Sequence, residues 1–529
     1  MDWLIAIAEF LVNEILSVPA FLIGIITAVG LMALKKSTGQ VLGGAIKATL
    51  GFLLVGAGAT LVVNSLEPLG IMIEGATGMH GVIPTNEAIA GIAQAQYGSQ
   101  VAWLMIAGFA VSLILARFTP LSYVFLTGHH VLFMATMLTI ILATSGYEGW
   151  VTVTVGAIVL GVMMVSLPAL AHPWTRKITG DDSIAIGHFG TAGYIASGAV
   201  GKVVGKNSRS TEDLKLPEGL RFLRDSMVST ALSMVLMYLV LAILFLVRAG
   251  SDEAFTAFED GATSVGNYLM QSATQGLEFG VAVAVILFGV RTILGELVPA
   301  FQGIAKKFVP GAIPSLDAPI VFPFAQNAVL IGFVSSFIGG LAGLVLLSLW
   351  LNPAFGAALI LPGLVPHFFT GGAAGVYGNA TGGRRGAVLG AFVNGIIITI
   401  LPAFLVLVLG TFGEENTTFG DADFGWMGIL VGVGSRAQGA VGIAIVLAIA
   451  LVLFLLAVLV QKKLVDGNWD PAPGHGATYG DDAKMEAMTG VDAADGGRGS
   501  TGGGLATKAY PKIAPPKGAP TPPPPPSRN

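Results

Sequence analysis

The chain of 529 residues is 54% hydrophobic and only 11% charged, and its mean hydropathy is +0.78. This composition excludes a soluble globular protein and predicts an integral membrane protein. The formal net charge of −4 gives no indication of a nucleic-acid partner. Cysteine is absent, which excludes disulfides, thiolate metal sites and a cysteine nucleophile.

Apolar stretches long enough to cross a bilayer as helices recur along the chain. In chain order, spans are predicted at about 15–34, 48–65, 100–117, 121–143, 150–171, 226–248, 273–291, 327–350, 354–378, 386–410 and 431–459. We therefore expect an all-α integral membrane protein with about eleven transmembrane helices.

The remaining stretches predict how these spans are organised. Residues 172–225 are polar and mixed in charge, which favours a cytoplasmic linker. Residues 464–529 are rich in Gly, Ala, Asp and Pro and cannot bury a core, so a disordered cytoplasmic tail is expected there. The predicted order is a first repeat at 1–171, the linker, a second repeat at 226–410, a last transmembrane helix within 411–463, and the tail.

Lysine and arginine orient the spans, because short cytoplasmic loops are enriched in both. Basic pairs such as Lys35–Lys36 and Arg384–Arg385 are assigned to the inside, whereas the alternate loops at 252–260 and 414–423 carry acids and no bases. This assignment predicts the N-terminus outside and the C-terminus inside the cell. It also predicts that the two five-helix repeats are inverted relative to each other, which places a substrate site where they meet near the membrane midplane.

A six-residue phrase occurs in both halves, as IPTNEA at 83–88 and as IPSLDA at 313–318. Its flanking motifs recur in the same order, which indicates an internal duplication. Each copy lies in a stretch rich in Pro and Gly, at about 68–99 and 299–326, and we expect two re-entrant hairpins there. Helix N-termini in such hairpins would offer free N–H groups to an oxygen-rich ligand.

Ionisable groups inside a membrane protein are functional candidates, because their burial is costly. The alternatives are structural: a histidine can be satisfied by a backbone carbonyl, and the two acids of the repeated phrase can cap helices. No catalytic constellation, metal site or cofactor motif is predicted. The candidate substrate-binding residues are Thr85, Asn86, Glu87, His129, His130, His188, Phe189, Ser315, Asp317, Gln326 and Asn327.

Five motifs carry a resemblance to a known family: LTGHH at 126–130, AIGH at 185–188, EDLKLP at 212–217, GELVPAFQGI at 295–304 and PGAIPSLDAPIVFPFAQNAV at 310–329. In these residues the chain resembles the ascorbate-specific permease, the enzyme IIC component, of the bacterial phosphotransferase system. The similarity covers about residues 15–460 and keeps the motif order. Where polar glutamines tend to follow the glycine-histidine pair in that family, Phe189 and Gly190 stand here, so related sugar acids stay open as substrates.

The resemblance implies a homodimer of eleven-helix protomers in the bacterial cytoplasmic membrane, in which a mobile core carries L-ascorbate inward by an elevator-like displacement. Carried over by position, His129, His188 and Asp317 are site residues, together with Thr85 and Asn86. The phosphoryl group would pass from phosphoenolpyruvate through enzyme I, HPr, IIA and IIB. Since IIB uses a phosphorylated cysteine, this cysteine-free chain requires a separate IIB and would be an enzyme only as part of that complex.

Two functions of other classes stay open. The first is an ion-coupled secondary transporter of a sugar acid or polyol that uses Glu87 and Asp317 as a proton relay. The second is a non-transporting membrane receptor or scaffold, for which two polar hairpins would be hard to explain. Uptake without phosphorylation would favour the first, and binding without accumulation would favour the second.

Overall fold

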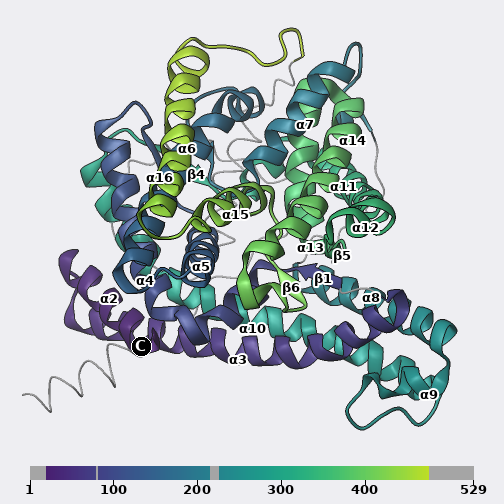
Figure 1. The fold of residues 1–529 in the computed structure, drawn as a ribbon. Helices are drawn as coiled ribbons and strands as arrows, with labels where there is room; N and C mark the ends of the chain where they lie inside the picture. The colour runs from purple at the N-terminus through teal and green to yellow at the C-terminus, as the bar shows by residue number, and fades with distance from the viewer. Residues whose placement is uncertain (1–18, 79–80, 215–225, 476–529) are drawn as a thin grey trace, which may run out of the picture. The chain divides into compact units, whose positions relative to one another are not determined.

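The structure, a computed structural model, describes residues 19–78, 81–214 and 226–475, and these residues are mostly helical (Figure 1). The helices of the first half are α2 (Pro19–Ala33), α3 (Thr38–Thr77), α4 (Asn86–Phe118), α5 (Gly128–Thr144), α6 (Gly149–Thr179) and α7 (Thr191–Val204). Those of the second half are α8 (Ser226–Ala249), α9 (Ser251–Ala254), α10 (Val265–Phe308), α11 (Gln326–Leu346), α12 (Asn352–Phe355), α13 (Leu364–Pro366), α14 (Gly372–Leu405), α15 (Ala422–Ser435) and α16 (Gly439–Val460).

Several of these helices can cross a membrane. Within the described residues, 8 helical stretches are long and apolar enough to do so, and α5 is a shorter apolar helix. The spanning stretches are Thr38–Thr77, Asn86–Phe118, Gly149–Thr179, Thr230–Ala249, Val265–Glu296, Gln326–Phe355, Leu364–Val408 and Gly439–Val465. The protein is therefore a multi-pass helical membrane protein. The total of eleven spans and their inverted arrangement stay predictions.

Two helices extend further toward the repeated phrases than hydropathy predicts. Helix α3 runs through Pro68 to Thr77, because its apolar side chains stay buried there, with Leu69 and Met72 fully covered. Helix α10 likewise continues to Phe308. The stretches at 68–99 and 299–326 are thus each the end of one long helix, a short strand and the start of a further helical segment. Their re-entrant course in the membrane stays a prediction.

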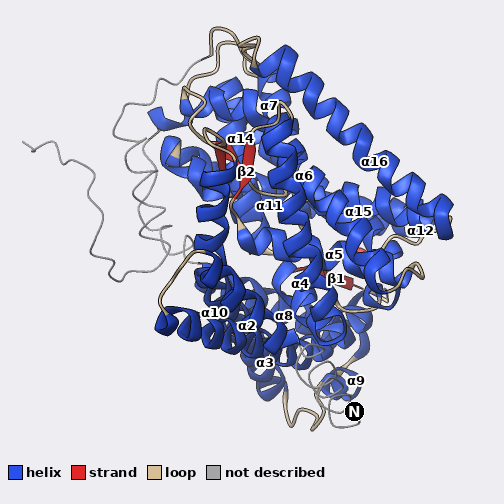
Figure 2. Ribbon diagram, turned by 90° about the vertical axis from the view of Figure 1, so that its left-hand side faces the viewer, coloured by secondary structure: helices blue, strands red, loops and turns tan. Residues whose placement is uncertain are grey.

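Short strands, which an all-α prediction does not contain, form two three-stranded parallel sheets (Figure 2). Their bounds are β1 (Gly81–Pro84), β2 (Tyr123–Phe125), β3 (Ala185–Ile186), β4 (Ile313–Leu316), β5 (Leu359–Ile360) and β6 (Thr417–Thr418). The strand orders are β5-β1-β6 and β2-β4-β3. Each copy of the repeated phrase begins in the central strand of one sheet and leads into a helical segment, an α-helix at Asn86 in the first copy and a 3-10 helix at Ala318–Phe324 in the second.

The long helices pack in two groups. In the first, the long helices α3 and α10 pack along each other, and α2 and α8 contact both of them toward opposite ends (Figures 1 and 2). An ion pair of 2.8 Å between Lys47 and Glu296 also joins α3 to α10. In the second, α14 packs between α7 and α11. Small residues permit this approach: a Cβ added at Gly390 of α14 would meet Ser197 of α7. Helix α4 packs on α6, which also contacts α16.

The segment at 172–225 differs from the predicted solvated linker. Helix α6 continues to Thr179, and 191–204 forms α7, whose buried residues include Tyr194 and Ser197. Its small residues let it pack closely on α14, which hydropathy averaging does not detect. After α7, Glu212 accepts hydrogen bonds from the backbone N–H groups of Asn327 and Ala328 at the start of α11.

The stretch at 411–463 contains two helices rather than one. Helix α15 ends at Ser435, the backbone turns at Gln438 with a φ of 55°, and α16 begins at Gly439. Beyond α16, the predicted tail begins with residues that contact α6: Asp470 pairs with Lys177 at 2.8 Å. Residues 476–529, on which most of the tail prediction falls, lie outside the described residues.

Candidate functional site

The candidate site residues follow the carboxyl ends of the strands. In the sheet β2-β4-β3, His129 and His130 follow β2, Asp317 follows β4 and His188 follows β3. Because the carboxyl ends of parallel strands lie at one edge of a sheet, side chains from three distant segments meet there. In the sheet β5-β1-β6, residues 85–87 follow β1 and Asp421 follows β6 in the same way.

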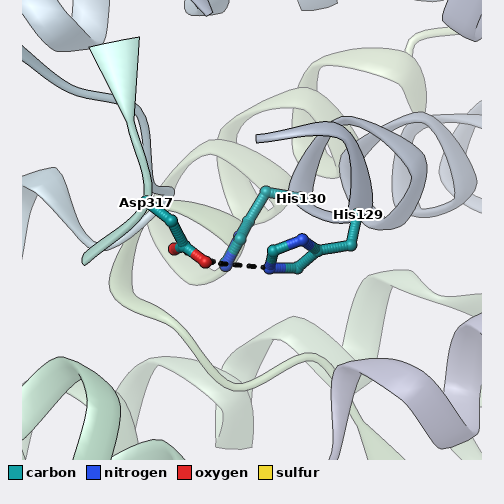
Figure 3. A group of neighbouring side chains, drawn as sticks. All are labelled: His129, His130 and Asp317. Atoms are coloured by element: carbon teal, nitrogen blue, oxygen red, sulfur yellow. Dashed lines mark ion pairs between the residues drawn. The ribbon is translucent and has the colours of Figure 1, made fainter. Parts of the chain in front are cut away.

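The more accessible part of the site is the outer pair, His129 and Asp317 (Figure 3). His129 Nε2 lies 3.3 Å from Asp317 Oδ2, and the side chains are 33% and 37% exposed. Asp317 also accepts a hydrogen bond of 2.7 Å from the Ala318 backbone N–H, since it caps the short helical segment Ala318–Phe324. One carboxylate therefore holds both a helix start and an imidazole in place.

Behind this pair lies the inner cluster, which we define as His130, His188 and Asp421. The ring centroids of the two histidines are 3.9 Å apart, and His130 Nδ1 lies 4.0 Å from Asp421 Oδ2. His188 Nδ1 is hydrogen-bonded to the Tyr194 hydroxyl at 2.8 Å. Both imidazoles also approach Asp317 Oδ1, at 4.0 Å for His130 Nε2 and 3.9 Å for His188 Nε2. The inner cluster and the outer pair thus form one continuous site.

Asn86 joins the first repeated phrase to this site. Its side-chain amide donates to Asp421 Oδ2 at 2.8 Å and accepts from the Gly420 backbone N–H at 2.9 Å. Both functions of the amide are used, so Asn86 fixes the loop after β6 and orients the carboxylate of Asp421. This pair connects residues that are 335 positions apart in the chain.

Asp423 holds the turn that carries His188. Its carboxylate accepts hydrogen bonds from the backbone N–H groups of Thr191 at 2.7 Å and Ala192 at 3.0 Å, at the N-terminus of α7. The Trp426 indole donates to the same carboxylate at 2.7 Å, and Asp423 is fully buried. A negative charge at a helix N-terminus is stabilised by the helix dipole. Asp423 is therefore a positioning residue for the turn at 188–190.

Of the other predicted residues, Glu87 and Thr85 lie beside the site. Glu87 stands in the first turn of α4, near enough to His129 for their charges to interact. Thr85 is the residue before α4, and its backbone N–H donates to Thr418 in β6. Ser315 is fully buried in β4, and its hydroxyl has no hydrogen-bond partner among the described residues. These three residues surround the strand ends that build the site.

The remaining predicted residues have other contacts. Phe189 is buried and stacks on Phe125 with ring centroids 4.9 Å apart, so it belongs to the core behind His188. Asn327 donates its side-chain amide to the carbonyl groups of Thr211 and Leu214, which commits it to anchoring the chain after α7. Gln326 begins α11 and is exposed. Phe189 also lies edge-on to the His130 ring of the inner cluster, with ring centroids 6.0 Å apart. For Gln326 and Asn327, no contact with the outer pair or the inner cluster is found among the described residues.

The sequence interpretation missed Asp421 and Asp423. It assigned both to an acidic external loop, but they are only 4% and 0% exposed. A signal was present: these acids lie between Phe419 and Phe424, which are both fully buried, unlike the acids of a solvated loop. Acids in an aromatic setting are more typical of a buried site than of a surface.

The site offers carboxylate acceptors and imidazoles that can donate or accept hydrogen bonds, a set suited to a small molecule with several hydroxyl or enol groups. Two groups of three side chains also place their ligand atoms within 4.8 Å of one another, as a metal ion would require: His129, His130 and Asp317, and the inner cluster. The two groups share His130, so they are alternatives for one ion.

Comparisons with known proteins indicate the family of the chain. Residues 14–423 match the family described as "PTS system sugar-specific permease component". The chain is also similar to a protein of Mycoplasma pneumoniae (strain ATCC 29342 / M129 / Subtype 1) named "Ascorbate-specific PTS system EIIC component", with 28% identity over 441 residues. That alignment covers 75% of this chain and 66% of the relative, so the chain spans slightly less than two thirds of the relative's length.

Proposed function

Since this chain belongs to the family of PTS system sugar-specific permease components, we propose that it binds L-ascorbate or a related sugar acid and translocates it inward for phosphorylation by a separate IIB component. The observation that supports the proposal best is the convergence of His129, His188 and Asp317, from three segments far apart in the chain, on one partly accessible site. The name of the Mycoplasma relative supports ascorbate as the substrate.

The charges of the site fit an anion that carries hydroxyl groups. The imidazoles of His129 and His188 both lie next to Asp317 and can donate hydrogen bonds to the negatively charged oxygen of a bound anion. The carboxylate of Asp317 would repel that oxygen but can accept a hydrogen bond from a neighbouring hydroxyl. A sugar acid presents both kinds of group within a few ångströms, whereas a simple inorganic anion presents only one.

The composition and the family of the chain indicate which partner proteins it would need. The chain contains no cysteine, so the phosphorylated cysteine of a IIB component must be supplied by another polypeptide, with IIA upstream of it. Within the proposal, the protein is a homodimer in the lipid of the bacterial cytoplasmic membrane, with the N-terminus outside and the C-terminus inside. The two halves are inverted repeats, and the core moves as an elevator between the two faces.

Uptake of radiolabelled L-ascorbate, followed by chromatography of the intracellular label, tests this function. Cells that express the full chain with a matching IIB should accumulate phosphorylated label, and cells with the chain alone should not. Label that accumulates unphosphorylated without IIB, and is lost when the proton gradient is collapsed, would overturn the proposal in favour of a proton-coupled secondary transporter. Binding without any uptake would favour a receptor.

A further inference from the structure

We propose that the inner cluster, His130, His188 and Asp421, is a binding site for a divalent transition-metal ion such as Zn²⁺ or Co²⁺. This inference goes beyond the proposed function, and metal binding does not depend on that function. Two imidazoles and one carboxylate are a ligand set typical of zinc sites that keep an open position. No metal-ligand motif is visible in the sequence, because the three residues come from separate segments, at the starts of α5 and α15 and after β3.

The first observation is the state of His130. Its ring is buried, with only 4% exposed, and its Nδ1 has no hydrogen-bond partner among the described residues. An unpartnered polar atom in a buried position is costly and calls for an explanation. The nearest acid oxygen to this nitrogen, Asp421 Oδ2, lies 4.0 Å away, too far for a hydrogen bond but suited to an ion between the two atoms.

The second observation is the spacing of the ligands. The three donor atoms lie within 4.8 Å of one another. Tetrahedral Zn²⁺ with bonds of about 2.0–2.1 Å holds its ligand atoms roughly 3.4 Å apart. The 4.0 Å between His130 and Asp421 would have to shorten by only ~0.6 Å, which side-chain rotation can supply.

The third observation is the support around the ligands. His188 Nδ1 is bonded to the Tyr194 hydroxyl, which leaves Nε2 for an ion and fixes the orientation of the ring. With an ion bound there, the ion would take the place of the Nε2–H as the group that meets a substrate oxygen. Asp421 accepts a hydrogen bond from Asn86, which holds its carboxylate. Such outer partners are characteristic of metal sites, where they fix ligand orientation and raise affinity.

The inner cluster fits an ion better than the alternative group of His129, His130 and Asp317. His129 and Asp317 already contact each other at 3.3 Å and are about one-third exposed, so water competes for their ligand atoms. The inner side chains are all at most 6% exposed. Access is still available, because the outer pair lies at the entrance. The open position of the ion would face Asp317, where water or a ligand oxygen could complete the coordination.

The experiment is a titration of the purified full chain, after removal of any affinity tag, with Co²⁺ followed by visible absorption. Wild-type protein should bind one ion per chain, and Zn²⁺ should abolish the Co²⁺ bands. The variants His130→Gln and Asp421→Asn should weaken binding by roughly 100-fold or more, since loss of an outer partner alone typically costs about 10–100-fold. Asn86→Ala removes only such a partner and should fall within that smaller range.

The matched control is His367→Gln, because His367 is also buried but bonds to Ser336 away from both groups. It should bind Co²⁺ like wild type. Diethylpyrocarbonate labelling of wild-type protein gives a readout that requires no variant: Zn²⁺ should protect His130 and His188, as read by mass spectrometry. Absence of saturable binding, unchanged affinity in His130→Gln, or no protection by Zn²⁺ would overturn the proposal. None of these results depends on transport, so they leave the proposed function to its own test.

Discussion

Replacement of Asp423 by asparagine tests whether a buried carboxylate positions the turn that carries the candidate site residue His188. In the native protein one oxygen accepts from the Thr191 backbone N–H at 2.7 Å, and the other accepts from Ala192 at 3.0 Å and from Trp426 at 2.7 Å. An asparagine side chain keeps one acceptor oxygen but turns its NH₂ group toward a donor. The variant therefore loses at least one charged hydrogen bond and places two donors face to face.

A hydrogen bond to a charged group contributes about 1.5–3 kcal/mol. If this free energy is needed to hold the turn at 188–190 in its binding geometry, Asp423→Asn should weaken substrate binding by about 10- to 100-fold, since about 1.4 kcal/mol corresponds to a factor of ten. Trp426→Phe removes only the indole donor and leaves both backbone bonds, so its effect should be smaller.

The assay is equilibrium binding of labelled L-ascorbate to purified full-length protein, with size-exclusion chromatography to establish that each variant is folded. Asp470→Asn is the matched control, since it alters a carboxylate that pairs with Lys177 rather than with α7. Affinity within about twofold of wild type in a folded Asp423→Asn variant would refute the positioning role.

Three further predictions concern other contacts. Asn86→Ala should lower substrate affinity by about tenfold or more in the same binding assay, because it removes a charged hydrogen bond of 2.8 Å to Asp421; an unchanged affinity would refute this. Gly383→Ala should destabilise the protein by roughly 1–3 kcal/mol in thermal unfolding, because Gly383 has a φ of 55° and ψ of −147° inside α14; an unfolding temperature like that of wild type would contradict it. Burial alone would raise the pKa of Asp470, but the hydrogen bonds from Lys177 and from the Ala472 backbone N–H, together with the charges of Lys177 and Arg176, outweigh this effect, and the net pKa lies below its ordinary value. A carboxyl group whose pKa is lower in the folded than in the unfolded protein stabilises the fold at pH values above its unfolded pKa, and this stabilisation is lost as the pH falls below about 4. The variant Asp470→Asn should therefore lack this part of the pH dependence of the free energy of unfolding, which amounts to less than about 1 kcal/mol because the side chain is partly exposed.

The membrane-spanning helices could be predicted from sequence because a bilayer demands long apolar runs. Helix ends were predicted less well. A span was predicted to end at about residue 65, yet α3 continues through Pro68 to Thr77, since burial of the neighbouring apolar side chains maintains the helix. The strands could not be predicted, because each is two to four residues long and pairs with segments that are hundreds of positions away, such as Ile83 with Thr417.

Part of the candidate site could be predicted from its ionisable residues, rather than from the hydropathy that predicts the spans. Ionisable residues in apolar surroundings pointed to His129, His188 and Asp317, which the structure brings together. Asp421 and Asp423 were missed because local composition placed them with solvated acids, and only the path of the chain after β6 buries them. The acid of the first phrase, Glu87, lies beside the site, while its neighbour Asn86 makes the direct contact with Asp421.

Binding of L-ascorbate to purified wild-type protein, His129→Asn and Asp317→Asn tests the central claim most directly. If the outer pair receives the substrate, wild type should bind saturably, and each variant should bind at least about tenfold more weakly, because each loses a charged hydrogen-bonding partner. The control His367→Gln should bind like wild type. Wild-type affinity in both folded outer-pair variants would contradict the claim that the substrate binds at the outer pair, at the carboxyl ends of β2 and β4.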